Sequence, residues 1–319
     1  MGASLNSLSG DLYESEILQL AMELAWIRPV APYPGWRFDV DWDNPLLAFQ
    51  LRREIWKYFQ KRKQQVPIII HWHGDLRLHL YLSNDISKQL YIAGCFEPNE
   101  FALLDKVLAP GMTFVDAGAN EGLFTLFAAP RVGPTGQVWA FEPSQREFLR
   151  LRRNLQLNQL GNVRTFQLAL ADYNGDTEMK IAADEHSGQN TLGDFAYPID
   201  IVRRERVMTG RLDDLVQREC LRQLDVLKLD VEGAELSVLT GASGILRQQR
   251  PLLLLELNDT ALRLQGSSGA AVVEFLRAFD YEIYGFDTAS GQPRSTSEVE
   301  LSDNILARPV KKATVSRVA

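Results

Sequence analysis

The sequence predicts an α/β protein with a doubly wound, Rossmann-like sheet, because strand-like and helix-like segments alternate over most of its 319 residues. Two observations support this fold class. A short apolar run ends at Asp116, and a glycine-containing turn then opens a helical pattern. A second apolar run follows that helix and ends on another acid, Glu142. Acids that end successive parallel strands would lie at one edge of the sheet, where ligands of such folds bind.

The composition is typical of a globular protein, with 45% hydrophobic and 24% charged residues. The net charge of −7 argues against a nucleic-acid backbone as the main partner. No apolar stretch approaches the ~20 residues of a membrane span, and the N-terminus lacks the pattern of a signal peptide. Cys95 and Cys220 form no C-x-x-C motif, so we expect neither a disulfide framework nor a zinc site, and a reducing, cytoplasmic location.

Residues 1–65 are expected to form a helical extension. Apolar side chains recur at helical spacing over 11–26 and 45–63, with several prolines between the two segments. Aromatic residues are frequent in this part of the chain: Trp26, Tyr33, Trp36, Phe38, Trp42 and Trp56. Two interpretations stay open. The extension packs against the main domain, or it forms a lid or a dimer arm that shapes a substrate pocket.

Residues 66–108 are expected to lead from the extension into the sheet. Strand-like runs at 66–72 and 76–82 predict a hairpin, and a helix is expected over 100–108. The hairpin contains three of the four histidines, but no carboxylate or cysteine accompanies them at a metal-ligand spacing. We therefore assign no metal ligands there.

The first strand of the sheet and its turn occupy residues 113–122. Gly118 and Gly122 allow the backbone to turn sharply and to approach a ligand closely. The helix that follows points its free N–H groups into the crevice. The turn differs from a dinucleotide-binding G-x-G-x-x-G loop because Ala119 and Asn120 replace the middle glycine.

The acids around this turn indicate which ligand it could hold. Asp116 would repel a diphosphate but could accept hydrogen bonds from an ammonium group, which favours a zwitterionic amino-acid nucleotide over NAD. S-adenosylmethionine fits this description. The separation between Asp116 and Glu142 is close to the ~20 residues that are typical of a ribose-binding carboxylate. Pro143 then ends the strand. An ordinary strand-to-helix turn without a ligand is the alternative.

Four motifs occur in a fixed order along the chain: Val115-Asp-Ala-Gly-Ala-Asn-Glu-Gly122, Ala140-Phe-Glu-Pro143, Asn154 with Asn158, and Leu227-Lys-Leu-Asp-Val-Glu-Gly-Ala-Glu235. Together they resemble the FkbM-type family of S-adenosylmethionine-dependent methyltransferases, over about residues 90–307. The resemblance implies a class I fold with a seven-stranded sheet and O-methylation of a hydroxyl group, but no particular acceptor. It also implies that Glu97, in a G-x-[FY]-E element, reaches the methionine end of the cofactor.

The remaining segments complete the expected sheet. We expect a helix over 145–160 that stops at Gly161, a polar loop over 179–199, a helix over 270–279, and further strands at 163–171, 226–231, 252–255, 281–286 and 304–307. Residues 109–310 therefore form the predicted S-adenosylmethionine-binding domain, and residues 311–319 a flexible tail. At the end of the third strand, the adenine should face Ala169, Leu170 and Asp172, although an aspartate in a turn is common without any ligand.

Three carboxylates are predicted at the carboxyl ends of two neighbouring strands: Asp230, Glu232 and Glu256. Crowding raises the pKa of at least one of them, which suits a base that removes the proton of an attacking hydroxyl. Asp230 would also face the cofactor. His186, the only histidine of the sheet domain, is a further candidate base. A divalent metal held by the three acids is a variant of this site, and we assign no dedicated metal ligands.

Two other functions compete with an O-methyltransferase. The chain could be a cofactor-binding partner subunit that has lost catalysis, although the retained acids argue against it. It could also be a nicotinamide-dependent oxidoreductase, which the missing phosphate-binding glycine disfavours. The expected partner is a small-molecule acceptor, such as a sugar or a natural-product scaffold, and a homodimer stays open.

Overall fold

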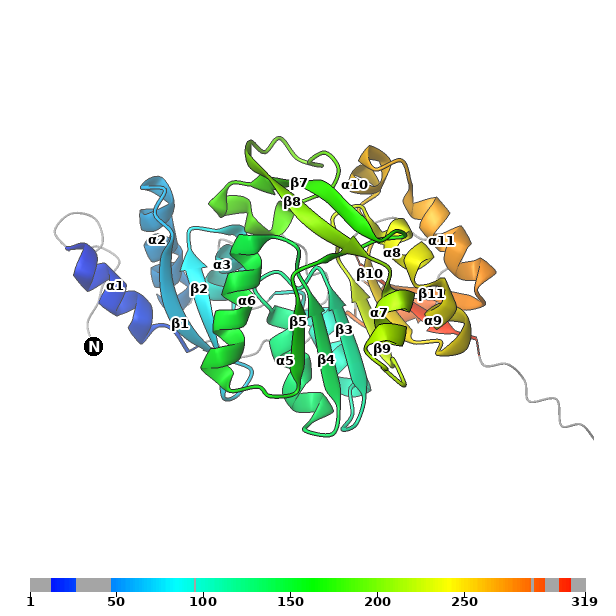
Figure 1. The fold of residues 1–319 in the computed structure, drawn as a ribbon. Coiled ribbons are helices and arrows are strands. Elements are labelled where there is room, and N and C mark those ends of the chain that lie inside the picture. The colour runs from blue at the N-terminus through cyan, green and yellow to red at the C-terminus, as the bar shows by residue number, and fades with distance from the viewer. Residues whose placement is uncertain (1–12, 27–46, 95, 288–289, 296–303, 311–319) are drawn as a thin grey trace, which may run out of the picture.

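The computed structural model describes residues 13–26, 47–94, 96–287, 290–295 and 304–310 (Figure 1). Its main sheet has eight strands in the order β12-β11-β13-β10-β9-β3-β4-β5. Their bounds are β3 Thr113–Ala117, β4 Gln137–Phe141, β5 Val163–Phe166, β9 Val226–Leu229, β10 Leu252–Glu256, β11 Tyr281–Phe286, β12 Pro293–Ser295 and β13 Asn304–Pro309.

The pairing of these strands confirms the predicted doubly wound sheet. Strands β5, β4, β3, β9 and β10 are parallel to one another, and β13 lies antiparallel between β10 and β11. The seven expected strands are present. The eighth, β12, was not predicted, because its three residues at the sheet edge carry no apolar pattern.

Helices cover both faces of the main sheet (Figure 1). Phe114 and Val115 are neighbours on β3, yet they are buried in the hydrophobic cores on opposite faces, as expected when both faces of a parallel sheet are covered. The α-helices after residue 97 in the described ranges are α4 Pro98–Val107, α5 Leu123–Val132, α6 Gln145–Asn158, α7 Leu212–Arg218, α8 Glu235–Gly241, α9 Ser243–Gln248, α10 Asp259–Leu264 and α11 Gly269–Ala278. The predicted stop of α6 at Gly161 is wrong, since Gln159 ends the helix with a left-handed φ of 54°.

The region after β5 differs most from the prediction. The expected single strand over 163–171 is two strands, β5 and β6 (Ala169–Leu170), which belong to different sheets. Strand β6 joins β7 (Gly175–Ala182) and β8 (Ile201–Gly210) in a three-stranded sheet. The expected loop over 179–199 is therefore partly strand, and it also contains a 3₁₀ helix, η3 (Asp184–Gln189). In Figure 1 the β7–β8 hairpin lies above the main sheet.

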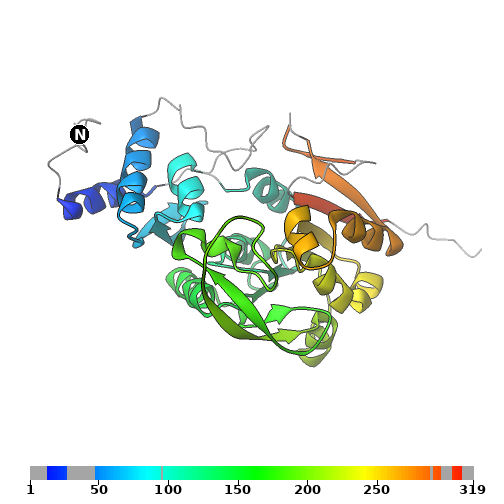
Figure 2. The same cartoon turned by 90° about the horizontal axis from the view of Figure 1, so that it is seen from above.

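The N-terminal part contains α1 (Glu14–Glu23), α2 (Leu47–Lys61) and the predicted hairpin, β1 (Val66–Trp72) with β2 (Leu76–Leu82). A short helix α3 (Asp85–Ser87) and a π-helix η2 (Lys88–Ala93) lead to α4. Figure 2 shows this part and α11 at opposite ends of the molecule. The predicted proline-rich break with Tyr33, Trp36, Phe38 and Trp42, the residue Cys95 and the tail 311–319 lie outside the described residues. No helix of the described ranges is long and apolar enough to cross a bilayer.

Candidate functional site

The turn between β3 and α5 packs closely against the backbone of Asp230 and the side chain of Leu151. Gly118 has a φ of +76°, and a Cβ there would lie 1.8 Å from the carbonyl oxygen of Asp230. Gly122 has a φ of +94°, and a Cβ there would lie 2.5 Å from Cδ1 of Leu151. Both positions therefore favour glycine for conformation, and Gly118 also requires it for space, since the atom in its way belongs to the backbone.

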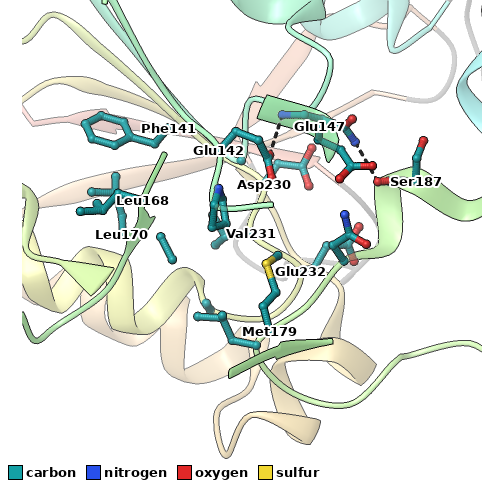
Figure 3. Close-up of a pocket in the computed structure, with 18 residues that line it drawn as sticks. Phe141, Glu142, Glu147, Leu168, Leu170, Met179, Ser187, Asp230, Val231 and Glu232 are labelled. Atoms are coloured by element: carbon teal, nitrogen blue, oxygen red, sulfur yellow. Dashed lines mark hydrogen bonds between the residues drawn. The ribbon is translucent and has the colours of Figure 1, made fainter. Parts of the chain in front are cut away.

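A pocket lies at the carboxyl ends of β3, β4 and β9, beside this turn, and encloses about 620 Å³ of empty space that includes some open solvent. In Figure 3 the apolar side chains of Phe141, Leu168 and Leu170 gather on one side, and Glu147 and Ser187 lie on the other. The lining residues are Gly118, Asn120, Phe141, Glu142, Pro143, Glu147, Leu168, Ala169, Leu170, Met179, Ser187, Gly188, Asn190, Leu192, Asp230, Val231, Glu232 and Ala234.

The pocket brings together eight of the residues predicted from the sequence. These are Gly118, Asn120, Glu142, Pro143, Ala169, Leu170, Asp230 and Glu232. The other predicted site residues do not belong to this lining: Glu97, Asp116, Ala119, Gly122, Asp172, His186 and Glu256. Their direct contact with a ligand stays a prediction.

Glu142 is held in place by two backbone amides. Its two carboxylate oxygens accept hydrogen bonds of 2.9 Å from the N–H groups of Asn120 and Ser144. Burial raises the pKa of Glu142 to about 8, and the nearby charge of Glu147 adds to this shift. Each oxygen keeps a further lone pair, so the carboxylate could still accept hydrogen bonds from a ligand.

Asp116 is fully buried behind the wall of the pocket. Its Oδ2 accepts a hydrogen bond of 2.6 Å from Thr125, and Nζ of Lys228 lies 3.5 Å from its Oδ1. Burial raises the pKa of Asp116, and the charge of Lys228 opposes that shift. Asp116 therefore supports the turn from inside the protein.

Asp230, Glu232 and Glu256 form one acidic cluster, with potential ligand oxygens that all lie within 4.8 Å of one another. Burial raises the pKa of Glu232, and the charge of Asp230 adds to it. Burial also raises the pKa of Glu256, where the charge of Glu232 is the next cause. Lys228 contacts Asp230 with an Nζ–Oδ2 distance of 3.0 Å. The predicted crowding of acids at neighbouring strand ends is therefore present.

Three of the remaining predicted residues lie outside the pocket lining. His186 is paired with Asp85 on α3, with an Nδ1–Oδ2 distance of 2.7 Å. Asp172 is exposed and accepts a hydrogen bond of 2.8 Å from the Ser237 hydroxyl. Glu97 is the buried N-cap residue of α4. Burial raises its pKa, and the charges of Glu100 and Asp230 add to this shift.

Sequence reasoning missed several residues of the pocket wall. Met179 lies on β7, and Ser187, Gly188, Asn190 and Leu192 belong to the segment predicted as a loop. The sequence signal for β7 is the alternation of apolar Met179 and Ile181 with polar Lys180. The structure buries the two apolar side chains more deeply than Lys180. Glu147 was also missed, because an acid in the first turn of a helix is common without a ligand.

The sheet order, with β13 inserted antiparallel, and the pocket at the carboxyl ends of the parallel strands define a class I methyltransferase fold. Residues 116–283, more than half of the chain, match the family model described as the Methyltransferase FkbM domain. The chain therefore belongs to the FkbM family of methyltransferases, as the motifs indicated.

Three curated relatives are similar to this chain. "Methyltransferase 1" of Beauveria bassiana is 30% identical over 172 residues, which cover 49% of this chain and 66% of that protein. The 2-O-methyltransferase NoeI of Sinorhizobium fredii is 26% identical, over 56% of this chain and 75% of that protein. The 31-O-demethyl-FK506 methyltransferase FkbM of Streptomyces tacrolimicus is 28% identical, over 55% of this chain and 75% of that protein. The chain thus spans slightly less than two thirds of the Beauveria relative.

Proposed function

We propose that this protein is an S-adenosylmethionine-dependent O-methyltransferase that acts on a hydroxyl group of a small molecule, such as a sugar or a natural-product scaffold. One observation carries the proposal: Gly118, Glu142 and Asp230 follow three neighbouring strands and line a single pocket. Two relatives, a 2-O-methyltransferase and a 31-O-demethyl-FK506 methyltransferase, are named for transfer to oxygen, which supports the same reaction here.

The pocket residues suit the parts of this cofactor. Glu142 can accept hydrogen bonds from the ribose hydroxyls, because its carboxylate is fixed by two amides and lines the pocket. The apolar side chains of Phe141, Leu168 and Leu170 offer a surface for the adenine ring. At Gly118 the absence of a Cβ lets the turn pack against the backbone of Asp230, so that both residues line the pocket.

The acidic cluster is suited to binding and activating the acceptor. When bound, S-adenosylmethionine supplies an electrophilic methyl group, and transfer requires an in-line approach of the acceptor oxygen. Asp230, Glu232 and Glu256 can orient a hydroxyl by accepting its hydrogen bond. A carboxylate whose pKa is raised by burial is also a stronger base near neutral pH, so it can take the hydroxyl proton.

A divalent metal at the acidic cluster is a second form of the same proposal. The potential ligand oxygens of Asp230, Glu232 and Glu256 lie within 4.8 Å of one another, and Mg²⁺ in enzymes is often held by one or two carboxylates together with substrate oxygens. If a metal takes part, EDTA should abolish methyl transfer and added Mg²⁺ should restore it. Activity that is unchanged by EDTA would exclude the metal form.

The test of the function is a binding measurement followed by an acceptor screen. Calorimetry should detect binding of S-adenosylhomocysteine, and NADH should not compete with it. Candidate sugars and hydroxylated natural products are then assayed for transfer of a labelled methyl group. A protein that binds NADH and not S-adenosylhomocysteine would be an oxidoreductase. Tight binding of S-adenosylhomocysteine without transfer to any acceptor would support a non-catalytic partner subunit. The location in the cytoplasm and the homodimer stay predictions.

A further inference from the structure

A buried ion pair supports the β3–α5 turn on the side away from the pocket. Glu121 lies in the turn and is only 1% exposed. Its Oε1 accepts a hydrogen bond of 2.7 Å from the guanidinium of Arg150 on α6. One helical turn further along α6, the amide of Asn154 donates to the carbonyl oxygen of Glu121 at 2.8 Å. Helix α6 therefore holds both the side chain and the backbone of Glu121.

The same two residues of α6 also contact the N-terminal hairpin, which packs beside α6 (Figure 1). The guanidinium carbon of Arg150 lies 3.7 Å from the centroid of the Tyr81 ring on β2. Oδ1 of Asn154 accepts a hydrogen bond of 2.8 Å from the backbone N–H of His79. Arg150 and Asn154 therefore connect β2 to the β3–α5 turn. Asn154 is the first asparagine of the family motif, and these two contacts give it a structural role.

The position of Glu121 matters because Asn120, its neighbour, is part of the pocket wall. Asn120 has a left-handed φ of 49°, a conformation that non-glycine residues adopt at an energetic cost and that the surrounding structure must maintain. The N–H of Asn120 also donates to Glu142 at 2.9 Å. A displacement of Glu121 would therefore move Asn120 and disturb the carboxylate proposed to bind ribose.

We propose that Arg150 and Glu121 are positioning residues that set the affinity for the cofactor, and that the N-terminal hairpin acts on the pocket through them. This proposal rests on the proposed function, because it places S-adenosylmethionine in the pocket. Neither residue lines the pocket. Both act by fixing the turn from which Gly118 and Asn120 reach the ligand.

The test compares Arg150→Met with Arg152→Met, a control on the exposed side of the same helix. Binding of S-adenosylhomocysteine is measured by calorimetry, well below the melting temperature of each variant. Arg150→Met should weaken binding by ~10-fold or more, because small misplacements of binding groups are costly, and Arg152→Met should bind as the wild type does. Glu121→Gln should weaken binding similarly, and the double variant should be little worse than either single variant.

Arg150→Lys keeps the test decisive if Arg150→Met does not fold. Lysine keeps the positive charge but has no planar fork to contact Glu121 while it stacks on Tyr81, so the affinity should be intermediate. In assays with an identified acceptor, KM for the cofactor should rise while KM for the acceptor and kcat change little. A folded Arg150→Lys or Arg150→Met that binds like the wild type would overturn the inference. A wild-type protein that does not bind S-adenosylhomocysteine would instead overturn the proposed function.

Discussion

Lys228 explains why an acid can be held at the position of Asp230. It lies opposite Asp116 in the register of β3 and β9, and its ammonium lies 3.5 Å from Asp116 and 3.0 Å from Asp230. Burial alone would lower the pKa of the Lys228 ammonium. The carboxylates of Asp230 and Asp116 outweigh this effect, so its pKa is raised overall. Lys228 therefore remains charged and donates a hydrogen bond of 3.0 Å to Oδ2 of Asp230, which holds this side chain in place.

Asp230→Asn tests the role of this carboxylate in the chemical step. The amide has almost the same shape but cannot take a proton from the acceptor, so turnover should fall at least ~10-fold. Affinity for S-adenosylhomocysteine should change little, since the space beside Gly118 is kept. Initial rates at saturating cofactor and calorimetry measure the two effects. Asp176→Asn, at an exposed ion pair with Arg206, is the control. Unchanged turnover in Asp230→Asn would show that Asp230 is not required for proton removal.

At the scale of elements, the strands that carry the site could be predicted from the sequence. Strands β3, β4, β9 and β10 are largely buried, and such strands appear as short apolar runs that end in acids or turns. Parallel pairing in which Leu255 lies opposite Leu229 then brings Glu256 next to Asp230. Acids at adjacent strand ends therefore follow from the sequence order alone.

Contacts between distant segments could not be predicted in this way. The ion pair of Glu121 with Arg150 joins a turn to the next helix but one, and His186 contacts Asp85, which lies 101 residues earlier in the sequence. Neither pair leaves a local pattern, because side-chain partners depend on how helices pack and not on periodicity. The division of residues 163–171 between two sheets was also missed, because no glycine or proline separates the two pieces.

Gly118→Ala tests the β3–α5 turn as an element. A Cβ at this position would lie 1.8 Å from the carbonyl oxygen of Asp230, and the φ of +76° is unfavourable for alanine. The backbone must shift, so we expect a loss of about 2 kcal/mol or more in the free energy of unfolding and weak binding of S-adenosylhomocysteine. Denaturant unfolding and calorimetry measure both.

The matched control for that turn is Gly161→Ala. A Cβ there would have no heavy atom within 4 Å, and Gly161 is not among the glycines with a positive φ. Its free energy of unfolding should therefore change by less than about 1 kcal/mol. If Gly118→Ala were as stable as Gly161→Ala and bound the ligand normally, the close approach between the turn and Asp230 would not be needed.

At the scale of the whole molecule, two parts line the pocket and a third contacts one of them. The main sheet supplies Gly118, Glu142 and Asp230, and the three-stranded sheet with η3 supplies the opposite wall. The N-terminal part touches η3 as well, since Asn84 donates to the Ser187 hydroxyl at 3.4 Å. Ligand binding should therefore stabilise all three parts together.

Buried carboxyl groups should also make the stability of the ligand-free protein depend on pH. Burial raises the pKa of Glu142 to about 8 and those of Glu121 and Glu235 to about 7. Such groups bind more protons in the folded state than in the unfolded state, so stability falls as the pH rises towards the folded-state pKa. His73 acts in the opposite direction, because burial lowers its pKa to about 4 and stability then rises with pH up to about 6.5. Above that value, the effect of the carboxyl groups remains alone.

The free energy of unfolding should therefore fall between about pH 6.5 and about pH 8, by about 1 kcal/mol or more. Glu142→Gln removes the carboxyl group whose pKa is about 8 and should flatten this fall, whereas Glu23→Gln, at an exposed position of α1, should keep the wild-type slope. Urea unfolding at a series of pH values measures the slopes for all three proteins. A wild-type stability that rises over this interval would mean that the buried acids are ionised in the folded protein. The acidic pocket would then have to be balanced by a bound cation or by solvent.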